Sequence, residues 1–433
     1  MMQKTVLTKA VAVALATLGV GAAFAQSSLT IYGNLDVAVD NVHKGQGDAS
    51  GTILAATTSV TAPSTVTRLT SSISSVNALG FKGTEDIGGG YKGGFVLEGQ
   101  FQLDTGAQSG QDGRMWGRQA FVSLTTPYGE VRLGRQYAPM FYSFATATVE
   151  ALGGADIMGS GLIVNNLQVR QDNQISYWLK AGDLTAAVSY SPQAGVDQKV
   201  SSARVSTGTY TSTSGEIIGG SGSGATAEAA NSQNRGQTVG LYLNYIVDPS
   251  LMVNGSVLGN RFGDAQLVSG ATVLANLRNY LGYSLGSKYI MPGTGTQFAG
   301  ILHRGEFKND PSDATGPKIN TIALGVKHPI GQFDVGAEYA YSKFANFTKG
   351  KDTSLMLMGD YNFSKRTKVY LRAGYAKDDR GQVASTGSGR PIAGGPLPLL
   401  TGFGSLETPF FSAAGANIDA TTRVVAIGIR HHF

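Results

Sequence analysis

Apolar and polar residues alternate along most of this chain, and the alternation has a period of two. In residues 29–40 the odd positions are mostly leucine, isoleucine and valine, whereas the even positions include asparagine and aspartate. Residues 91–103 and 369–377 repeat the pattern. Because successive side chains of a strand point to opposite faces, the pattern predicts strands that each have one apolar face.

About sixteen segments of this kind follow one another, and the connections between them are alternately short and long. The predicted strands span residues 29–40, 72–84, 91–103, 116–125, 130–137, 170–180, 183–191, 237–247, 250–259, 279–290, 297–306, 319–328, 332–343, 353–362, 367–377 and 421–433. The long connections span residues 41–71, 104–115, 138–169, 192–236, 260–278, 307–318, 344–352 and 378–420.

An even number of antiparallel strands with short turns at one end and long loops at the other is typical of an outer-membrane barrel. Strands of about ten residues also match a tilted span through a bilayer. A β-sandwich or a solenoid is the alternative, but strands in globular proteins average only five or six residues. We therefore expect an all-β fold, a sixteen-stranded antiparallel transmembrane β-barrel.

The third long connection, residues 138–169, is unusual for its length and its composition. A connection of some thirty residues is far longer than a hairpin loop, and it is therefore either functional or disordered. Met140, Phe141, Phe144, Leu152 and Ile157 make it too apolar for a solvated tail. We expect this segment to pack against the strands that flank it.

The first 25 residues are read as a cleaved signal peptide. Lys4 and Lys9 precede an apolar run that ends in the small-x-small pattern Ala23-Phe24-Ala25. An N-terminal membrane anchor is the alternative, but the apolar run is too short to span a bilayer. The expected domain organisation is a signal peptide at residues 1–25 and one barrel domain at residues 26–433.

The composition of the chain excludes several classes of function. The chain has no cysteine, which excludes disulfides, thiol catalysis and thiolate metal sites. Removal of the two lysines of the leader reduces the formal charge from +5 to +3, and so mild a charge gives no reason to expect a nucleic-acid partner. Adjacent His431 and His432 point to opposite faces of a strand, and we expect no metal site there.

Several stretches together resemble the general porin family of Gram-negative outer membranes, especially its β-proteobacterial branch. They are Leu29-Thr30-Ile31-Tyr32-Gly33, Leu79 to Gly90, Arg118-Gln119-Ala120-Phe121-Val122, Leu133-Gly134-Arg135-Gln136, Arg170 to Tyr177 and the terminal Phe433. The resemblance implies a homotrimer of sixteen-stranded barrels whose third extracellular loop folds into the lumen. It also implies contacts with outer-membrane lipid and lipopolysaccharide, and recognition of the strand ending in Phe433 by the barrel-assembly machinery.

The resemblance also implies a constriction at which wall arginines face acidic residues of the loop. Arg118 and Arg170 resemble the family's wall arginines, and alternation places Arg170 and Arg132 on the luminal face, whereas it leaves Arg118 and Arg135 undecided. The expected acidic residues of the loop are Glu150 and Asp156. Basic residues of the wall thus outnumber acidic residues of the loop, which favours anions weakly.

One position departs from the family pattern. Many relatives have arginine immediately before Leu-Gly-Phe-Lys-Gly, where this chain has Ala78. Arg68, ten residues earlier, or Lys82, four residues later on the same face, is a candidate replacement.

The expected function is passive diffusion of small hydrophilic solutes and ions through the outer membrane, with a mild preference for anions and no cofactor. An enzyme is the second class, but none of the five histidines is accompanied by a serine and an acid in a catalytic motif. A substrate-specific channel or an adhesin that uses loops 192–236 and 378–420 is a third alternative.

Overall fold

The structure is a computed structural model that describes nine stretches of the chain, namely residues 28–45, 64–109, 114–149, 170–192, 237–269, 272–310, 315–345, 350–379 and 421–433. The N-terminal strands and the helix that the structure describes are β1 (Ser28–Lys44), β2 (Ser64–Ser71), β3 (Ala78–Gly88), β4 (Tyr91–Phe101), β5 (Gln108–Ser109), β6 (Gln119–Thr126), β7 (Gly129–Tyr137), α2 (Pro139–Thr146), β8 (Arg170–Ala181) and β9 (Leu184–Ser191). The remaining strands are β10 (Gln237–Asp248), β11 (Leu251–Ser269), β12 (Thr272–Ile290), β13 (Gln297–Asp310), β14 (Thr315–Ile330), β15 (Phe333–Ala345), β16 (Gly350–Asn362), β17 (Thr367–Asp379) and β18 (Thr421–His432).

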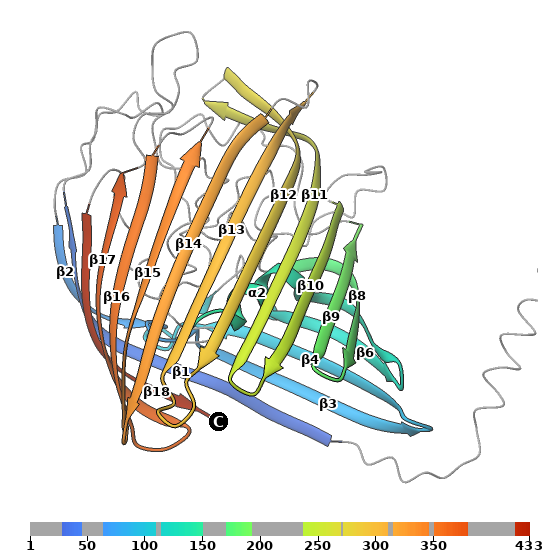
Figure 1. The fold of residues 1–433 in the computed structure, drawn as a ribbon, viewed down its shortest axis with the longest axis horizontal. Helices are drawn as coiled ribbons and strands as arrows, with labels where there is room; N and C mark the ends of the chain where they lie inside the picture. Colours follow the sequence, from blue (N-terminus) through green and yellow to red (C-terminus); the bar gives the residue numbers. More distant parts are fainter. Residues whose placement is uncertain are drawn as a thin grey trace, which may run out of the picture.

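Antiparallel pairing closes the sheet into a barrel. Among the described strands, the circuit runs from β1 through β3 and β4, then from β6 in sequence order to β18, which pairs again with β1. This circuit contains sixteen strands, and β2 and β5 add local pairings beside β1 and β4. The predicted barrel and its strand number are confirmed. Figure 1 shows the tilted strands of the wall and α2 behind β10–β12.

The two faces of the wall differ as the alternation predicts. On β18, Val425, Ile427 and Ile429 are exposed and point outward, whereas Val424 and Ala426 are buried and point inward. Exposed apolar side chains continue around the outside of the described strands, as a bilayer-facing surface requires. No helix among the described residues has the length and apolar character needed to cross a membrane.

The chain closes its own barrel with its last residue. The backbone N–H of Phe433 donates to the carbonyl of Gly33 at 3.2 Å, and that of Gly33 donates to the carbonyl of Phe433 at 3.1 Å. The Phe433 ring lies where a side chain at position 33 would be, so the missing Cβ of Gly33 makes room for it. The terminal aromatic residue thus packs on the first strand.

Several predicted boundaries were wrong. The connection predicted at residues 260–278 is mostly strand, because β11 continues to Ser269 and β12 begins at Thr272. The connections predicted at 307–318 and 344–352 are shortened in the same way by β13–β14 and β15–β16. Inter-strand pairing continues in these stretches beyond the residues that alternate clearly.

Candidate pore constriction

The described part of the 138–169 connection lies inside the barrel, as predicted. It begins with α2, which has Pro139 at its first turn, where the missing N–H of proline has no cost. The helix contacts β9, β10, β11 and β12 from the inside. Ser143 accepts a hydrogen bond from the Ser284 hydroxyl at 2.8 Å, and Thr146 Oγ1 accepts one from the Asn254 amide at 2.8 Å. Packing inside the barrel was expected on the flanking strands, whereas the helix contacts mainly β10, β11 and β12, and its helical form was not predicted.

Glycines on the inner wall make room for this segment. A Cβ at Gly240 would meet Pro139 at 3.0 Å, and one at Gly286 would meet the Cβ of Ala147 at 2.5 Å. Cβ atoms at Gly282 and Gly325 would meet Met140 at 2.9 Å and Val149 at 3.0 Å, respectively. The wall is therefore shaped to receive the segment closely from β10 to β14.

The in-folded segment reaches far across the interior. The backbone N–H of Val149 donates to Glu338 on β15 at 3.3 Å. Residues 150–169 lie outside the described residues, and with them the predicted acidic residues Glu150 and Asp156.

The structure brings Arg118 and Arg170 together on one tyrosine. Tyr137, the last residue of β7, accepts hydrogen bonds at its hydroxyl from Arg118 at 2.6 Å and from Arg170 at 3.0 Å. The Arg170 guanidinium also lies 4.6 Å from the centre of the Tyr137 ring, in cation–π contact. Both arginines are buried, and Arg118 is thereby placed on the inner side that alternation left undecided.

Glu98 of β4 holds Arg118 in this position. Its carboxylate forms an ion pair with the Arg118 guanidinium and accepts a hydrogen bond from the Tyr32 hydroxyl at 2.7 Å. Each partner satisfies a polar group that burial would otherwise leave without hydrogen bonds. The carboxylate that faces this wall arginine therefore comes from the wall itself.

Two further arginines, Arg114 and Arg135, share one carboxylate. Asp172 of β8 forms ion pairs with Arg114, at 2.9 Å, and with Arg135. Arg135 also donates to the carbonyl of Gly117 at 2.7 Å. These contacts define the orientation of the Arg135 side chain, which the sequence left undetermined. Asn173 has a φ of 53°, and the pairing of β7 with β8 shifts here, so alternation along β8 is interrupted close to Arg170.

Arg132 stands among aromatic rings. Its guanidinium lies 4.7 Å from the centre of the Trp178 ring and 5.4 Å from that of Phe121, and it donates to Glu130 at 2.7 Å. Tyr142 of α2 packs edge-on against Trp178 at 4.7 Å. Burial raises the pKa of the Tyr142 phenol to about 12. The residue therefore stays neutral at physiological pH.

Of the two candidate replacements, Lys82 lies beside Tyr32, which donates to the Glu98 partner of Arg118, whereas Arg68 is paired with another carboxylate. Arg68 is paired with Asp40 of β1 at 2.9 Å, beside the pairing of β1 with β2. Lys82 is exposed and lies 5.2 Å from the centre of the Tyr32 ring, toward the end of the barrel with the short turns. Ala78 is buried at the start of β3.

An inward turn precedes Ala78, where the sequence predicted a strand beginning at residue 72. Residues 72–77, which we call the inward turn, separate β2 from β3. The Asp36 carboxylate accepts backbone N–H bonds from Ile73 at 3.0 Å, Ser74 at 3.1 Å and Ser75 at 2.9 Å. Ile73 is buried in an apolar cluster inside the barrel that also contains Val149. The predicted strand was wrong here because a carboxylate competes with a neighbouring strand for these donors.

Sequence reasoning missed four side chains that organise this region, namely Asp36, Glu98, Tyr137 and Asp172. Asp36 and Glu98 occupy polar positions of clearly alternating strands, so an inward direction could be inferred, but their partners could not. Tyr137 and Asp172 lie at strand ends, where alternation gives little information.

Comparison with known proteins agrees with this geometry. The family model for Gram-negative porins matches residues 10–381. The chain belongs to the Gram-negative porin family. Outer membrane porin protein 32 of Delftia acidovorans is 30% identical over 97% of this chain and 99% of its own length. An outer membrane porin protein of Bordetella pertussis is 26% identical over the full length of both chains.

Among solved structures, the anion-selective porin from Comamonas acidovorans matches this porin with a TM-score of 0.63 and 23% identity, covering 94% of this chain and 100% of the other. At that identity the likeness concerns the fold. The resemblance drawn from the sequence is confirmed, and the porin is an integral outer-membrane channel for small hydrophilic solutes.

Proposed function

We propose that this porin prefers anions weakly and that its inner wall between β4 and β8 causes the preference. Among the described residues, this region contains five arginines and three carboxylates, which is an excess of two positive charges. The arginines are Arg114, Arg118, Arg132, Arg135 and Arg170, and the carboxylates are Glu98, Glu130 and Asp172. Fixed charges beside a narrow aqueous path set ion selectivity. The structural relative described as anion-selective supports the proposal.

In this proposal Arg118, Arg170 and Arg132 form the basic side of the constriction. Arg68 and Lys82 add positive charge nearer the two ends of the path, and Glu150 and Asp156 of the third loop form the acidic side. Reversal potentials in planar bilayers under a salt gradient test it. We expect an anion-preferring potential that weakens in the R118A/R170A double variant. A cation-preferring potential that is unchanged in the double variant would contradict the proposal.

We further propose how the porin is processed and assembled. Residues 1–25 are removed on export, residues 26–433 form one barrel, and three copies form the working channel. The barrel-assembly machinery recognises the last strand through Phe433, whose pairing with Gly33 closes the barrel. The long connections face the cell exterior, where lipopolysaccharide surrounds them. Heat-modifiable migration of an outer-membrane fraction, with a trimer band before heating and N-terminal sequencing from Gln26, is the expected result.

The family and the relatives are channels, and we propose that this porin has no catalytic role. The loops predicted at residues 192–236 and 378–420 lie almost entirely outside the described residues. Esterase or protease turnover by the purified porin would contradict this part of the proposal.

A further inference from the structure

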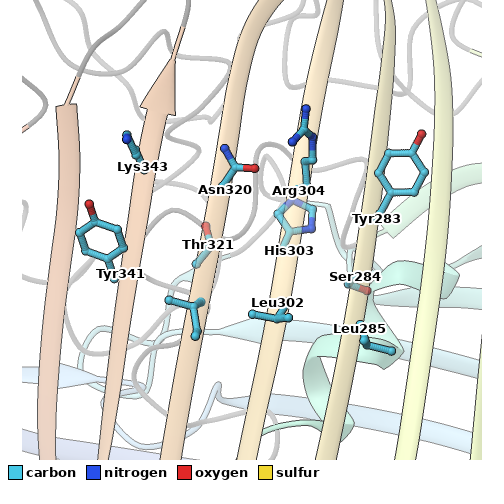
Figure 2. A pocket seen from close by; sticks show the side chains of 11 residues that line it. Tyr283, Ser284, Leu285, Leu302, His303, Arg304, Asn320, Thr321, Tyr341 and Lys343 are labelled. Atoms are coloured by element: carbon cyan, nitrogen blue, oxygen red, sulfur yellow. The ribbon is translucent and has the colours of Figure 1, made fainter.

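The polar groups of the inner wall change in kind from strand to strand. On β12, β13 and β14 they are hydroxyls and an imidazole: Figure 2 shows Ser284, His303 and Thr321 on these strands, and all three are buried. On β16, β17 and β18 the inward groups include charged side chains, namely Asp360, Lys368, Arg372 and Arg430. We call Lys368, Arg372 and Arg430 the basic triad. These charges belong to neither side of the proposed constriction.

Asp360 pairs with two members of the basic triad. Its carboxylate forms ion pairs with Lys368 and, at 2.6 Å, with Arg372. Lys368 is directly opposite Arg430 across the sheet, and Arg430 is directly opposite Asp36. Like charges directly opposite each other on a sheet destabilise it. Among the described residues, the triad thus places three cations beside two carboxylates.

Two guanidinium groups of the triad converge on one neutral oxygen. Ser74 of the inward turn accepts hydrogen bonds at its hydroxyl from Arg430 at 3.1 Å and from Arg372 at 3.3 Å. Its backbone N–H donates to Asp36, which keeps the hydroxyl at this place. A guanidinium bonds a charged oxygen about twice as strongly as a neutral one. The Ser74 hydroxyl therefore occupies a position in which an oxygen atom of an anion would be bound more strongly.

This position adjoins the proposed constriction. Ser74 and Arg372 are buried, whereas Arg430 is only half-buried. Tyr32 of β1 contacts Glu98 of the constriction, and Asp36, which contacts the inward turn, lies four residues further along the same face of β1. Four residues of a strand span about 13 Å. An anion at the constriction arginines is therefore a short distance from Arg430.

We propose that the basic triad binds the phosphate dianion and that the bound phosphate displaces the Ser74 hydroxyl. Arg430 makes the first contact, the inward turn gives up its Ser74 hydrogen bonds to the wall, and Arg372 and Lys368 then donate to the anion. Two guanidinium groups and an ammonium suit a compact anion with several acceptor oxygens better than they suit chloride. The site names a solute class for the proposed anion preference and rests on the entry of anions into the lumen.

The test measures thermal unfolding of the purified full-length porin in neutral detergent as inorganic phosphate replaces chloride at constant ionic strength. A saturable rise of the unfolding temperature is expected, because a ligand of the folded state stabilises it. The R430A variant should bind phosphate at least about tenfold more weakly, since a hydrogen bond to a charged group contributes on the order of a factor of ten. The S74A variant should bind it more tightly than the unchanged porin, because the competing hydroxyl is gone.

The matched control is R68A, which removes an arginine whose partner is Asp40 of β1 and should keep the phosphate affinity. Equal loss in R430A and R68A, or equal saturation by succinate, would overturn the site. An S74A variant that binds phosphate as weakly as R430A would overturn the displacement, and because S74A removes no charge it serves as the test even if R430A does not fold. The R118A/R170A variant should keep the phosphate affinity, so failure of the proposed anion preference would be seen separately in reversal potentials.

Discussion

The hydroxyl of Tyr370 donates a hydrogen bond of 2.7 Å to the carboxylate of Asp36, a residue 334 positions earlier in the chain. Strand β18 lies between their strands, β1 and β17, and Gly428 of β18 leaves room for the Tyr370 side chain to reach across. With three backbone N–H groups of the inward turn, four donors converge on one buried carboxylate. Asp36 therefore ties the inward turn to the far end of the sequence.

The D36N variant should open the channel. An asparagine offers one acceptor oxygen and turns an NH₂ group toward backbone donors, so the inward turn loses its anchor, at a cost of about 1–3 kcal/mol for the unsatisfied groups. The aqueous cross-section should widen. Single-channel conductance should then rise roughly 1.5-fold, with faster entry of larger sugars into liposomes.

Asp40 provides the matched control for D36N. It is a buried carboxylate on the same strand and face, but its partner is Arg68 and not the inward turn. The D40N variant should keep the conductance and the sugar cutoff of the unchanged porin. A rise in D40N equal to that in D36N would show that loss of any buried charge on β1 has the effect.

A single introduced cysteine tests whether the inward turn borders water. The chain has no cysteine, so a new thiol is labelled uniquely. Ser75 is half-buried in the inward turn, whereas Leu79 is exposed on the outward face of β3. A charged methanethiosulfonate should lower the conductance of S75C and leave that of L79C unchanged. Unaltered current in fully labelled S75C would mean that this turn does not line the ion path.

The E98Q variant should strengthen the preference for anions. It removes the charge that neutralises Arg118 and leaves a side chain of nearly the same shape. The reversal potential under a salt gradient should move toward the anion limit, and the movement should shrink at high ionic strength because salt screens the field. Glu306, which lies on the outer face, supplies the control E306Q, and a shift of the same size there would point to a general charge effect.

The G286V variant should disturb the third loop. Its Cβ would meet the Cβ of Ala147 at 2.5 Å, so the in-folded segment must move or the wall must bend, at about 1–3 kcal/mol. We expect a lower unfolding temperature and noisier open-channel current. At Gly259 no heavy atom of the described residues lies within 4 Å of the added Cβ, and G259V should behave like the unchanged porin.

The sequence was sufficient for the barrel because alternation is a local property that each strand displays by itself. The same rule placed Arg170 and Arg132 on the inner side. The irregularity at Asn173 interrupts the alternation of β8 only three residues from Arg170. It failed at residues 72–77, where the deciding partner is Asp36. A carboxylate some 40 residues away leaves no periodic signal in the segment that it binds.

The partners of the arginines could not be predicted for a similar reason. Alternation gives the face on which a side chain lies, but not which residues of other strands stand at the same height. Glu98 meets Arg118 only through the register of β4 and β6, and Arg114 meets Asp172 across 58 positions. The expectation that acidic partners come from the third loop therefore omitted the carboxylates of the wall.

Tyr137 gives the channel one further property. Its hydroxyl orients Arg118 and Arg170, while its ring stacks on Phe141 of α2 at 4.3 Å, immediately after the chain has left the wall. Tyr137 thus contacts both the segment that enters the lumen and the two arginines that carry positive charge there. Size exclusion and charge discrimination are consequently not independent traits in this channel, and selection on either one will alter the other.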